Sequence, residues 1–205
     1  MPDAPARRVG PIGIMVTMRL PDLTPAEMNG AQRALHDRIT DGPRASGTQH
    51  FPLTTADGAL TGPFGVMVHA PAIGAPLQEL GGAVRYATGL TERVRELAIL
   101  AVATATGSDF EAYAHARIGR AAGLTDGELD DLAAGAFTSA DPAEQAAYNL
   151  CRRLLEDRSR LTDEDYAGLV AELGSTTLTE LVVLVGYYRT LAQLLDVFEV
   201  GVPAE

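Results

Sequence analysis

Apolar residues along the chain recur three and four positions apart, in runs that begin after a polar residue and end at a glycine. This spacing places the apolar side chains on one face of an α-helix. No stretch alternates apolar and polar positions for long enough to predict a strand, so we expect an all-α protein. The predicted helices span residues 25–40, 72–88, 92–106, 109–122, 126–134, 142–158, 163–173 and 177–198.

The predicted helix boundaries rest on capping signals. An N-cap oxygen followed three residues later by a carboxylate is typical of a capping box, because each group satisfies a free backbone N–H. Such pairs occur in TPAE at 24–27, TDGE at 125–128 and DPAE at 141–144, and further candidate caps are Thr91, Thr162 and Thr176. Glycines that follow apolar runs are predicted helix stops, namely Gly123, Gly135 and Gly174.

The segment 41–71 differs from the rest of the chain. It is rich in Gly, Pro and Thr and contains His50 and His69. A loop of this length is uncommon in a compact domain unless it lines a site or meets a partner. We interpret it as pocket lining. The chain is therefore predicted to form a single all-α domain over 1–205, with an N-terminal segment (1–71) that holds one helix and the long loop, and a helical core (72–205).

Composition and charge narrow the range of partners. Apolar residues make up 46% of the 205 positions and aromatic residues 5%, which suits closely packed helices built from Ala, Leu and Val. The net charge of −11 argues against nucleic acid and anionic membranes, since both bind basic patches, and we expect neither partner. The single cysteine, Cys151, excludes a thiol pair for redox chemistry and is predicted to be a buried structural thiol.

The N-terminal residues do not resemble a signal peptide. Residues 1–20 contain two arginines and an apolar patch that is broken by Pro11 and Gly13, and no small-residue cleavage site follows. The longest later apolar run, 181–188, is far shorter than a membrane span. We therefore expect a cytoplasmic protein.

One carboxylate lies in an unusually apolar helix. The predicted helix is apolar on nearly every face from Val94 to Ala105, which is typical of a buried helix, yet it contains Glu96. One interpretation is that Glu96 pairs with Arg93 and supports the helix N-terminus. The other is that Glu96 is a buried carboxylate with a raised pKa, which can move protons.

A second polar group follows in the next predicted helix. Ser108, Glu111 and His115 are spaced three and four residues apart, so they share one stripe of that helix. The carboxylate of Glu111 can set the tautomer and basicity of the His115 ring. Alternatively, Glu111 only satisfies the histidine on a half-exposed face, or the two bind a metal ion. A second nearby pair of ligands is missing, so we expect no metal.

The segment LTERVRELAILAVATATGSDFEAYAHARIGRAAGLTDGELDDLAAG (90–135) resembles the core motif of the carboxymuconolactone decarboxylase family, whose superfamily includes the alkylhydroperoxidase D type. LTGPFGVMVHAP and STTLTELVVLVGYYRTLAQLLDVFEV resemble the lead-in and the C-terminal helix of longer members. The resemblance implies an alkylhydroperoxidase D-like helical bundle, here preceded by the long Gly/Pro-rich loop. It also implies a homo-oligomer, a trimer or hexamer, which the apolar residues on several faces of the last helix favour as well.

The branches of this superfamily differ in their reactive residues. The hydroperoxidase branch has a Glu followed by two cysteines and a His. Here Glu96 and His115 match the Glu and the His, whereas Ser108 and Glu111 stand where the cysteines would be. A dithiol peroxidase cannot work without thiolates, so we reject that activity. The decarboxylase branch has a Glu four residues before its His, and Glu111 and His115 match that pattern.

The resemblance implies a small-molecule enzyme without an organic cofactor. A decarboxylase-like lyase or an isomerase needs an acid and a base across a mainly apolar pocket, with a keto-acid, lactone or polyketide-like substrate. The expected catalytic residues are Glu96, Glu111 and His115. The expected substrate-binding residues are Ser108, His69, Arg85 and Arg95. The alternative is a noncatalytic small-molecule-binding or assembly protein that retains the fold.

Overall fold

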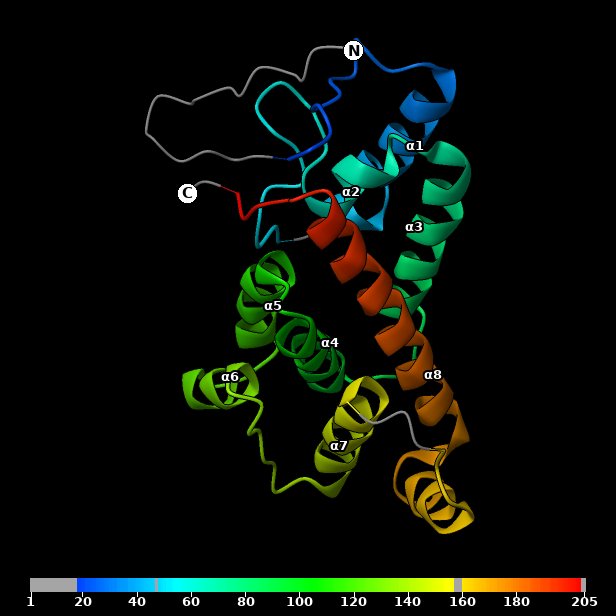
Figure 1. Ribbon diagram of the computed structural model, residues 1–205, viewed down its shortest axis with the longest axis vertical. Coiled ribbons are helices and arrows are strands. Elements are labelled where there is room, and N and C mark those ends of the chain that lie inside the picture. Colours follow the sequence, from blue (N-terminus) through cyan, green and yellow to red (C-terminus); the bar gives the residue numbers. More distant parts are fainter. Residues whose placement is uncertain (1–17, 47, 157–159, 204–205) are drawn as a thin grey trace.

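The computed structural model describes residues 18–46, 48–156 and 160–203 (Figure 1). In this part of the chain every regular element is a helix, apart from one isolated antiparallel bridge between Thr54 and Leu60. The prediction of an all-α fold is therefore confirmed, whereas most of the N-terminal segment 1–20 lies outside the described residues. The elements are α1 (Gly30–Thr40), the 3₁₀-helix η1 (Pro43–Ala45), α2 (Gly62–Met67), α3 (Pro71–Tyr86), α4 (Glu92–Thr106), α5 (Asp109–Ala121), α6 (Asp126–Ala133), α7 (Pro142–Glu156) and α8 (Asp163–Val197).

Most of the predicted caps are present. Thr91 accepts a hydrogen bond from the backbone of Val94 at the start of α4. Full capping boxes begin α6 at Thr125 and α8 at Thr162. Asp141 accepts from the first backbone N–H groups of α7, but the Glu144 carboxylate turns away from it to other partners. These caps fix where the core helices start, and so they fix which side chains face one another.

The first helix begins later than predicted. Glu27 accepts hydrogen bonds from the backbone N–H and the hydroxyl of Thr24, so TPAE forms a local turn outside the helix. The helix begins at Gly30, because Asn29 and Gln32 form a capping box there. A capping motif five residues downstream thus replaced the predicted one, and residues 25–29 are not helical.

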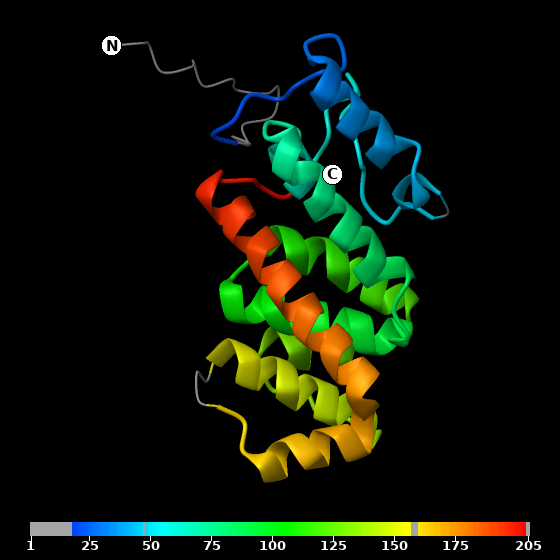
Figure 2. The same ribbon diagram turned by 90° about the vertical axis from the view of Figure 1, so that its right-hand side faces the viewer.

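The predicted helix stop at Gly174 is confirmed, because α8 consists of two helical stretches that meet there at a kink. Gly174 has φ 76° and ψ 155°, a conformation open to glycine but strongly disfavoured for other residues. Helix α8 resumes directly after it, so the predicted cap at Thr176 is wrong. Figure 2 shows the first part of α8 turned sharply away from the long remainder, which crosses the molecule.

Helix α2 lies inside the predicted loop 41–71 and was missed. It has six residues and starts with Gly62 and Pro63, which masked its short apolar run. All six residues are buried. Gly62 has φ 57°, and a Cβ on it would come within 2.3 Å of the Phe110 ring, so glycine is required there.

The core is organised around α4. Leu97, Ala98 and Ile99 on this helix are fully buried, and α5, α6, α7 and α8 all pack against it. Figure 1 shows α4 at the centre of these helices, with α1, α2 and the top of α3 gathered at one end of the molecule. Helix α4 is therefore enclosed, as its all-round apolarity predicts, and a polar side chain on it must find its partners inside the protein.

Helix α8 has two kinds of apolar surface. By length and composition alone it would be long and apolar enough to cross a membrane. The core accounts for part of this character, because Leu181 and Leu184 are fully buried. Val182 and Val183 are 45% and 40% exposed. Self-association over this exposed face stays a prediction.

Candidate active site

A tight turn between α4 and α5 brings the predicted reactive residues together. Gly107 has φ 65° at the end of α4, and the N–H of Ser108 donates to the carbonyl of Ala103, which closes the helix end. The two helices then run back alongside each other. Glu96 on α4 and His115 on α5 consequently face each other, although 19 residues separate them.

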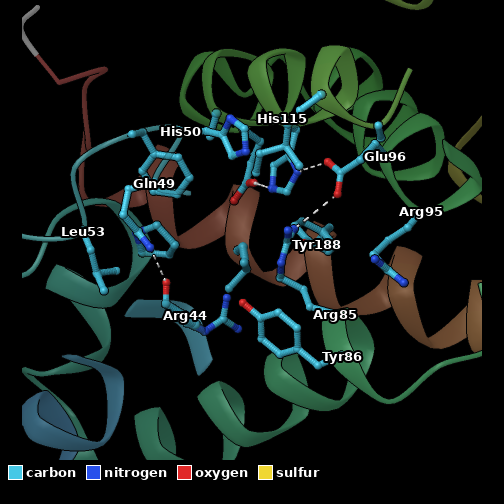
Figure 3. Close-up of a pocket in the computed structure, with 18 of the residues that line it drawn as sticks. Arg44, Gln49, His50, Leu53, Arg85, Tyr86, Arg95, Glu96, His115 and Tyr188 are labelled. Atoms are coloured by element: carbon cyan, nitrogen blue, oxygen red, sulfur yellow. Dashed lines mark hydrogen bonds and ion pairs between the residues drawn. The ribbon is translucent and has the colours of Figure 1, made fainter. Parts of the chain in front are cut away.

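His115 lies between two carboxylates (Figure 3). Its Nδ1 is 2.6 Å from Oε2 of Glu96, and its Nε2 is 3.3 Å from Oε2 of Glu111, one helical turn earlier. All three side chains are buried, with exposed fractions of 7%, 1% and 3% for His115, Glu96 and Glu111. Both ring nitrogens therefore have an acidic partner in an environment that excludes bulk water.

Two further elements complete the walls around this trio. From α3, Nη1 of Arg85 lies 3.4 Å from Oε1 of Glu96, so the carboxylate is held between a guanidinium and the imidazole. From α8, the ring of Tyr188 packs edge-on against His115 with the centroids 5.2 Å apart. Arg93 does not contact Glu96 and pairs with Glu128 and Glu144 instead, so the predicted Arg93–Glu96 pair is wrong.

The charges set the protonation state of the trio. Burial alone lowers the pKa of His115, but the carboxylates of Glu96 and Glu111 outweigh this effect and raise that pKa above its usual value. Burial alone raises the pKa of Glu96, but His115, Arg85 and Arg95 outweigh it and lower that pKa. The expectation of a raised pKa for Glu96 is therefore wrong. The favoured state is an imidazolium beside an ionised Glu96.

The trio lines a cavity of about 380 Å³. Residues from 43–46 and 48–53, part of the predicted pocket-lining loop, contribute to its wall together with α3, α4, α5 and α8. The lining is mixed in character, with aromatic rings beside charged groups. Its polar residues include Arg44, Gln49, His50, Arg85, Glu92, Arg95, Glu96, Glu111, His115, Tyr187 and Tyr188.

Two of the four predicted substrate-binding residues reach this cavity. Arg85 and Arg95 line it, and Arg95 also donates to the carbonyl of Leu90. Ser108 is not on the helical stripe, because it is the N-cap residue of α5, and it lines a separate hollow of about 200 Å³. His69 Nε2 lies 3.0 Å from the carbonyl oxygen of Pro21 and does not line the cavity. Neither Ser108 nor His69 lines the cavity that contains His115, so their predicted placement at the reactive site is wrong.

Several polar residues of the cavity were not predicted as site residues, among them Arg44, Tyr187 and Tyr188. Arg44 lies in η1 within the Gly/Pro-rich loop, where no periodicity marks a side chain as buried. Tyr187 and Tyr188 lie in an apolar run of α8, where tyrosine is easily taken for core packing. Adjacent tyrosines within an apolar run were the available signal, because a buried hydroxyl needs a partner.

Several polar atoms of the cavity are buried without a hydrogen-bond partner in the described part of the chain. They are Oε1 of Glu111, the hydroxyl of Tyr187, Nε and Nη2 of Arg44, and Nε of Arg95. Buried polar groups are nearly always satisfied, so such a concentration in one cavity is typical of a ligand site. Among the described residues, no group of three or more His, Cys, Asp or Glu is arranged to hold a metal ion.

Cys151 is remote from this chemistry. It is fully buried in α7 and does not line the cavity. Burial raises the pKa of its thiol to about 12, so the thiolate is disfavoured at neutral pH. The prediction of a buried structural thiol is confirmed.

Comparisons with known proteins agree on the fold. The model of the carboxymuconolactone decarboxylase family matches residues 71–153, which include Arg85, Glu96, Glu111 and His115. No curated protein gives a significant match.

Three solved structures illustrate the similarity. An alkylhydroperoxidase AhpD core protein from Ralstonia eutropha JMP134 has a TM-score of 0.70 at 15% identity, covering 91% of this chain and 92% of that one. A protein of unknown function from Agrobacterium tumefaciens, linked to antioxidant defence and AhpD, has a TM-score of 0.60 at 18% identity, covering 67% and 94%. A cysteine variant of the debrominase Bmp8 in complex with 2,3,4-tribromopyrrole has a TM-score of 0.66 at 12% identity, covering 94% of both chains. At these identities the likeness shows an AhpD-like fold.

Proposed function

We propose that the protein is a small-molecule enzyme that moves protons through His115 and Glu111 without a cofactor, because residues 71–153, which carry both side chains, match the model of the carboxymuconolactone decarboxylase family. The observation that carries this proposal is the convergence of Glu96, His115 and Glu111 on one cavity. The debrominase Bmp8 supports it more generally, since a similar fold there holds a small aromatic molecule.

The two carboxylates have different roles in this proposal. Glu96 is a positioning residue, because one oxygen holds Nδ1 of His115 and the other faces Arg85. Glu111 is a catalytic residue, because its Oε1 is buried at the cavity without a partner and can accept a proton from a bound molecule. The imidazolium of His115, with its raised pKa, is the acid that donates a proton.

These groups suit reactions that pass through an enolate. In a decarboxylation, the bond to the carboxyl carbon breaks, its electron pair moves into the neighbouring carbonyl as carbon dioxide leaves, and His115 then protonates the carbon. In an isomerisation, Glu111 takes a proton from one carbon and His115 delivers one to another. Keto acids, lactones and polyketide-like ketones all have the carbonyl that this chemistry requires.

Thiol chemistry is not part of the proposal. Ser108 and Glu111 occupy the positions at which the resemblance places two cysteines, and the thiol of Cys151 is buried elsewhere. A dithiol peroxidase needs a reactive thiolate that meets its substrate. The proposed reaction is therefore a lyase or isomerase reaction and not a reduction of peroxides.

The alternative of a noncatalytic assembly protein is less well supported. It requires a filled interior in which His115 and the carboxylates merely satisfy one another. The cavity and the unpartnered Oε1 of Glu111 count against that arrangement. A noncatalytic binder would keep the cavity, and so it differs from the enzyme only in turnover.

Turnover is tested with a panel of β-keto acids, unsaturated lactones and polyketide-like ketones incubated with the protein in deuterium oxide. Mass spectrometry follows loss of carbon dioxide, and proton NMR follows deuterium entering the carbon next to the carbonyl. We expect turnover or exchange of at least one class with the wild-type protein, loss of it with His115→Asn, and retention with Cys151→Ala. Activity that survives in His115→Asn would contradict the proposal, as would the absence of both signals across the panel.

A further inference from the structure

Three arginines line the cavity, and of these only Arg85 forms an ion pair with another described residue. Arg85 faces Glu96, and Arg95 donates to the carbonyl of Leu90 while its charge helps to lower the pKa of Glu96. Arg44 forms no ion pair with any carboxylate in the described part of the chain. Arg44 is half-buried, but its Nε and Nη2 are buried at the cavity without a hydrogen-bond partner, so an anion placed there would satisfy both donors.

The free atoms of Arg44 define what it can bind. Its unpartnered nitrogens, Nε and Nη2, are adjacent on one side of the guanidinium and both are buried. Elsewhere in this chain the same side binds carboxylates: Arg93 holds Glu144 with Nε and Nη2 at 2.7 and 3.2 Å, and Arg152 holds Glu156 with both at 2.8 Å. This edge matches the two oxygens of a carboxylate.

A neighbouring hydroxyl completes the subsite. The Tyr187 hydroxyl is also buried, and it lies beside the Arg44 guanidinium under α3, in electrostatic contact with it. Gly81 of α3 makes this approach possible, because a Cβ there would lie 2.0 Å from the Tyr187 oxygen and 2.7 Å from Nη2 of Arg44. Burial raises the pKa of Tyr187 to about 12, so its hydroxyl stays protonated and can donate.

The position of Arg44 is held from several directions. Its guanidinium stacks over the ring of Phe64 at 4.8 Å from the centroid, and Gln49 donates to its backbone carbonyl at 3.1 Å. Figure 3 shows Arg44 entering the site from the loop side, while Arg95 lies beyond Arg85 and Glu96. Arg44 lies outside the segment 71–153 that matches the family.

We propose that Arg44 and Tyr187 form an anion subsite that selects ligands bearing a carboxylate, with Nε and Nη2 of Arg44 each donating to one carboxylate oxygen and the Tyr187 hydroxyl donating to the same group. This proposal deepens the proposed function and rests on the same cavity. It adds that the substrate keeps an anionic group beside Arg44 while another part of it meets His115 and Glu111. Arg44 is then a specificity-determining residue contributed by the N-terminal loop.

The subsite is tested by isothermal titration calorimetry with benzoate and its neutral analogue benzamide. The variants are Arg44→Leu, Arg44→Lys and Tyr187→Phe, and the control is Arg120→Leu, an exposed arginine that pairs with Asp126 at the surface. We expect the wild-type protein to bind benzoate more tightly than benzamide, and Arg44→Leu to weaken benzoate about ten- to a hundredfold with no effect on benzamide. Arg44→Lys keeps the charge but loses the paired donors, and it should recover only part of the affinity.

Circular dichroism and thermal unfolding establish that each variant folds. If Arg44→Leu does not fold, Tyr187→Phe carries the test, and we expect it to weaken benzoate severalfold while the ring packing is kept. The proposal is overturned if benzoate does not bind in the millimolar range, if benzamide binds as well as benzoate, or if both Arg44→Leu and Tyr187→Phe bind benzoate like the Arg120→Leu control.

The calorimetry is independent of turnover. If the protein prefers benzoate in an Arg44-dependent way but turns over no substrate of the panel, the subsite is supported and the enzymatic function is contradicted. If activity requires His115 but benzoate binding does not depend on Arg44, the enzymatic function is supported and the subsite is contradicted.

Discussion

Two charged clusters include residues of α4, Arg93 in the first and Glu96 three positions later in the second, and they differ in one respect. The first is centred on Arg93, which binds Glu144 through Nε and Nη2, Glu128 through Nη2, and the carbonyl of Gly123 through Nη1. Ser139 donates to Glu144 as well. Each donor nitrogen of Arg93 has an acceptor, and the cluster joins α4 to α6 and α7.

The second cluster is centred on His115 and is more deeply buried than the first. Its inner pair, Glu96 and His115, is well matched at 2.6 Å. At the cavity, however, Oε1 of Glu111, the hydroxyl of Tyr187 and two nitrogens of Arg44 have no partner among the described residues. Several polar groups of this second cluster therefore line the cavity without a partner.

The contrast separates stability from function. A network whose groups are all satisfied stabilises the fold and has no capacity left for a ligand. A buried network with free donors and acceptors is costly to keep, and it is most easily understood as a site that a ligand completes. The two clusters therefore predict opposite consequences of mutation.

The largest expected effect is on catalysis at the His115 cluster. We expect Glu111→Gln to lower kcat by about 10²- to 10⁴-fold, the range typical of a lost acid–base group, with little change in the free energy of unfolding. Glu96→Gln should lower kcat less and move the pH profile to lower pH, because His115 loses the neighbour that raises its pKa. Steady-state kinetics across pH on an active substrate measures both. Equal losses with an unchanged pH profile would remove the distinction between the two carboxylates.

The next effect is on stability at the Arg93 cluster. Arg93→Met leaves Glu144 and Glu128 without their main cation, and we expect it to lower the free energy of unfolding by about 2 kcal/mol. Urea denaturation measures this loss. Activity should be retained, because Arg93 does not line the cavity. A stable but inactive Arg93→Met variant would mean that the two clusters are not independent.

The carboxylates of the Arg93 cluster and the imidazole of His115 should respond to pH in opposite directions. Hydrogen bonds from Arg93 and Thr125 lower the pKa of Glu128 to about 2, and the Arg93 hydrogen bond lowers that of Glu144 as well. Their stabilisation is therefore present above the ordinary carboxyl pKa of 4.5 and is lost as pH falls towards 2. The pKa of His115 is raised, so its stabilisation is complete below 6.5 and is lost as pH rises through the folded value.

Urea denaturation from acid to mildly alkaline pH measures how the free energy of unfolding depends on pH. We expect this free energy to fall at low pH (the acid limb) and at high pH (the alkaline limb). Arg93→Met should flatten the acid limb, and His115→Asn should flatten the alkaline one. If Arg93→Met flattens the alkaline limb instead, or if His115→Asn leaves the alkaline limb unchanged, the assignment of the groups is wrong.

The smallest effect is expected at Cys151. Cys151→Ala removes a buried sulfur, and we expect it to cost about 1 kcal/mol of stability and to leave activity unchanged. Denaturation and the same kinetic assay measure the two quantities. If activity falls by more than the fraction of folded protein, the thiol of Cys151 takes part in the reaction, and the exclusion of thiol chemistry is wrong.

Local signals were sufficient for most of the fold. Thr91, Thr125 and Thr162 begin helices, and Gly123, Gly135 and Gly174 take positive φ, because caps and stops depend on a few neighbouring residues. Helix α2 and the start of α1 were not predictable in this way. Helix α2 is short and held by burial, and α1 had two competing capping sequences.

The site was predictable where it depends on helical spacing. Glu111 and His115 share a helix face, and Glu96 was a carboxylate in an otherwise apolar helix. The position of Arg44 depends on how a loop folds back over α3 and α8, which no periodicity encodes. Ser108 was predicted to share the helix face of Glu111 and His115, but the helix begins one residue after it. Helical spacing therefore does not apply to Ser108.

The most direct test of the central claim is an NMR titration of the His115 imidazole in the wild-type protein and in Glu96→Gln. The account predicts that the His115 ring titrates above the usual 6.5 in the wild-type protein, because two carboxylates flank it, and that the pKa falls in Glu96→Gln. An imidazole that titrates at or below 6.5 in the wild-type protein, or one that Glu96→Gln leaves unchanged, would contradict the claim that this buried pair holds the proton used in the reaction.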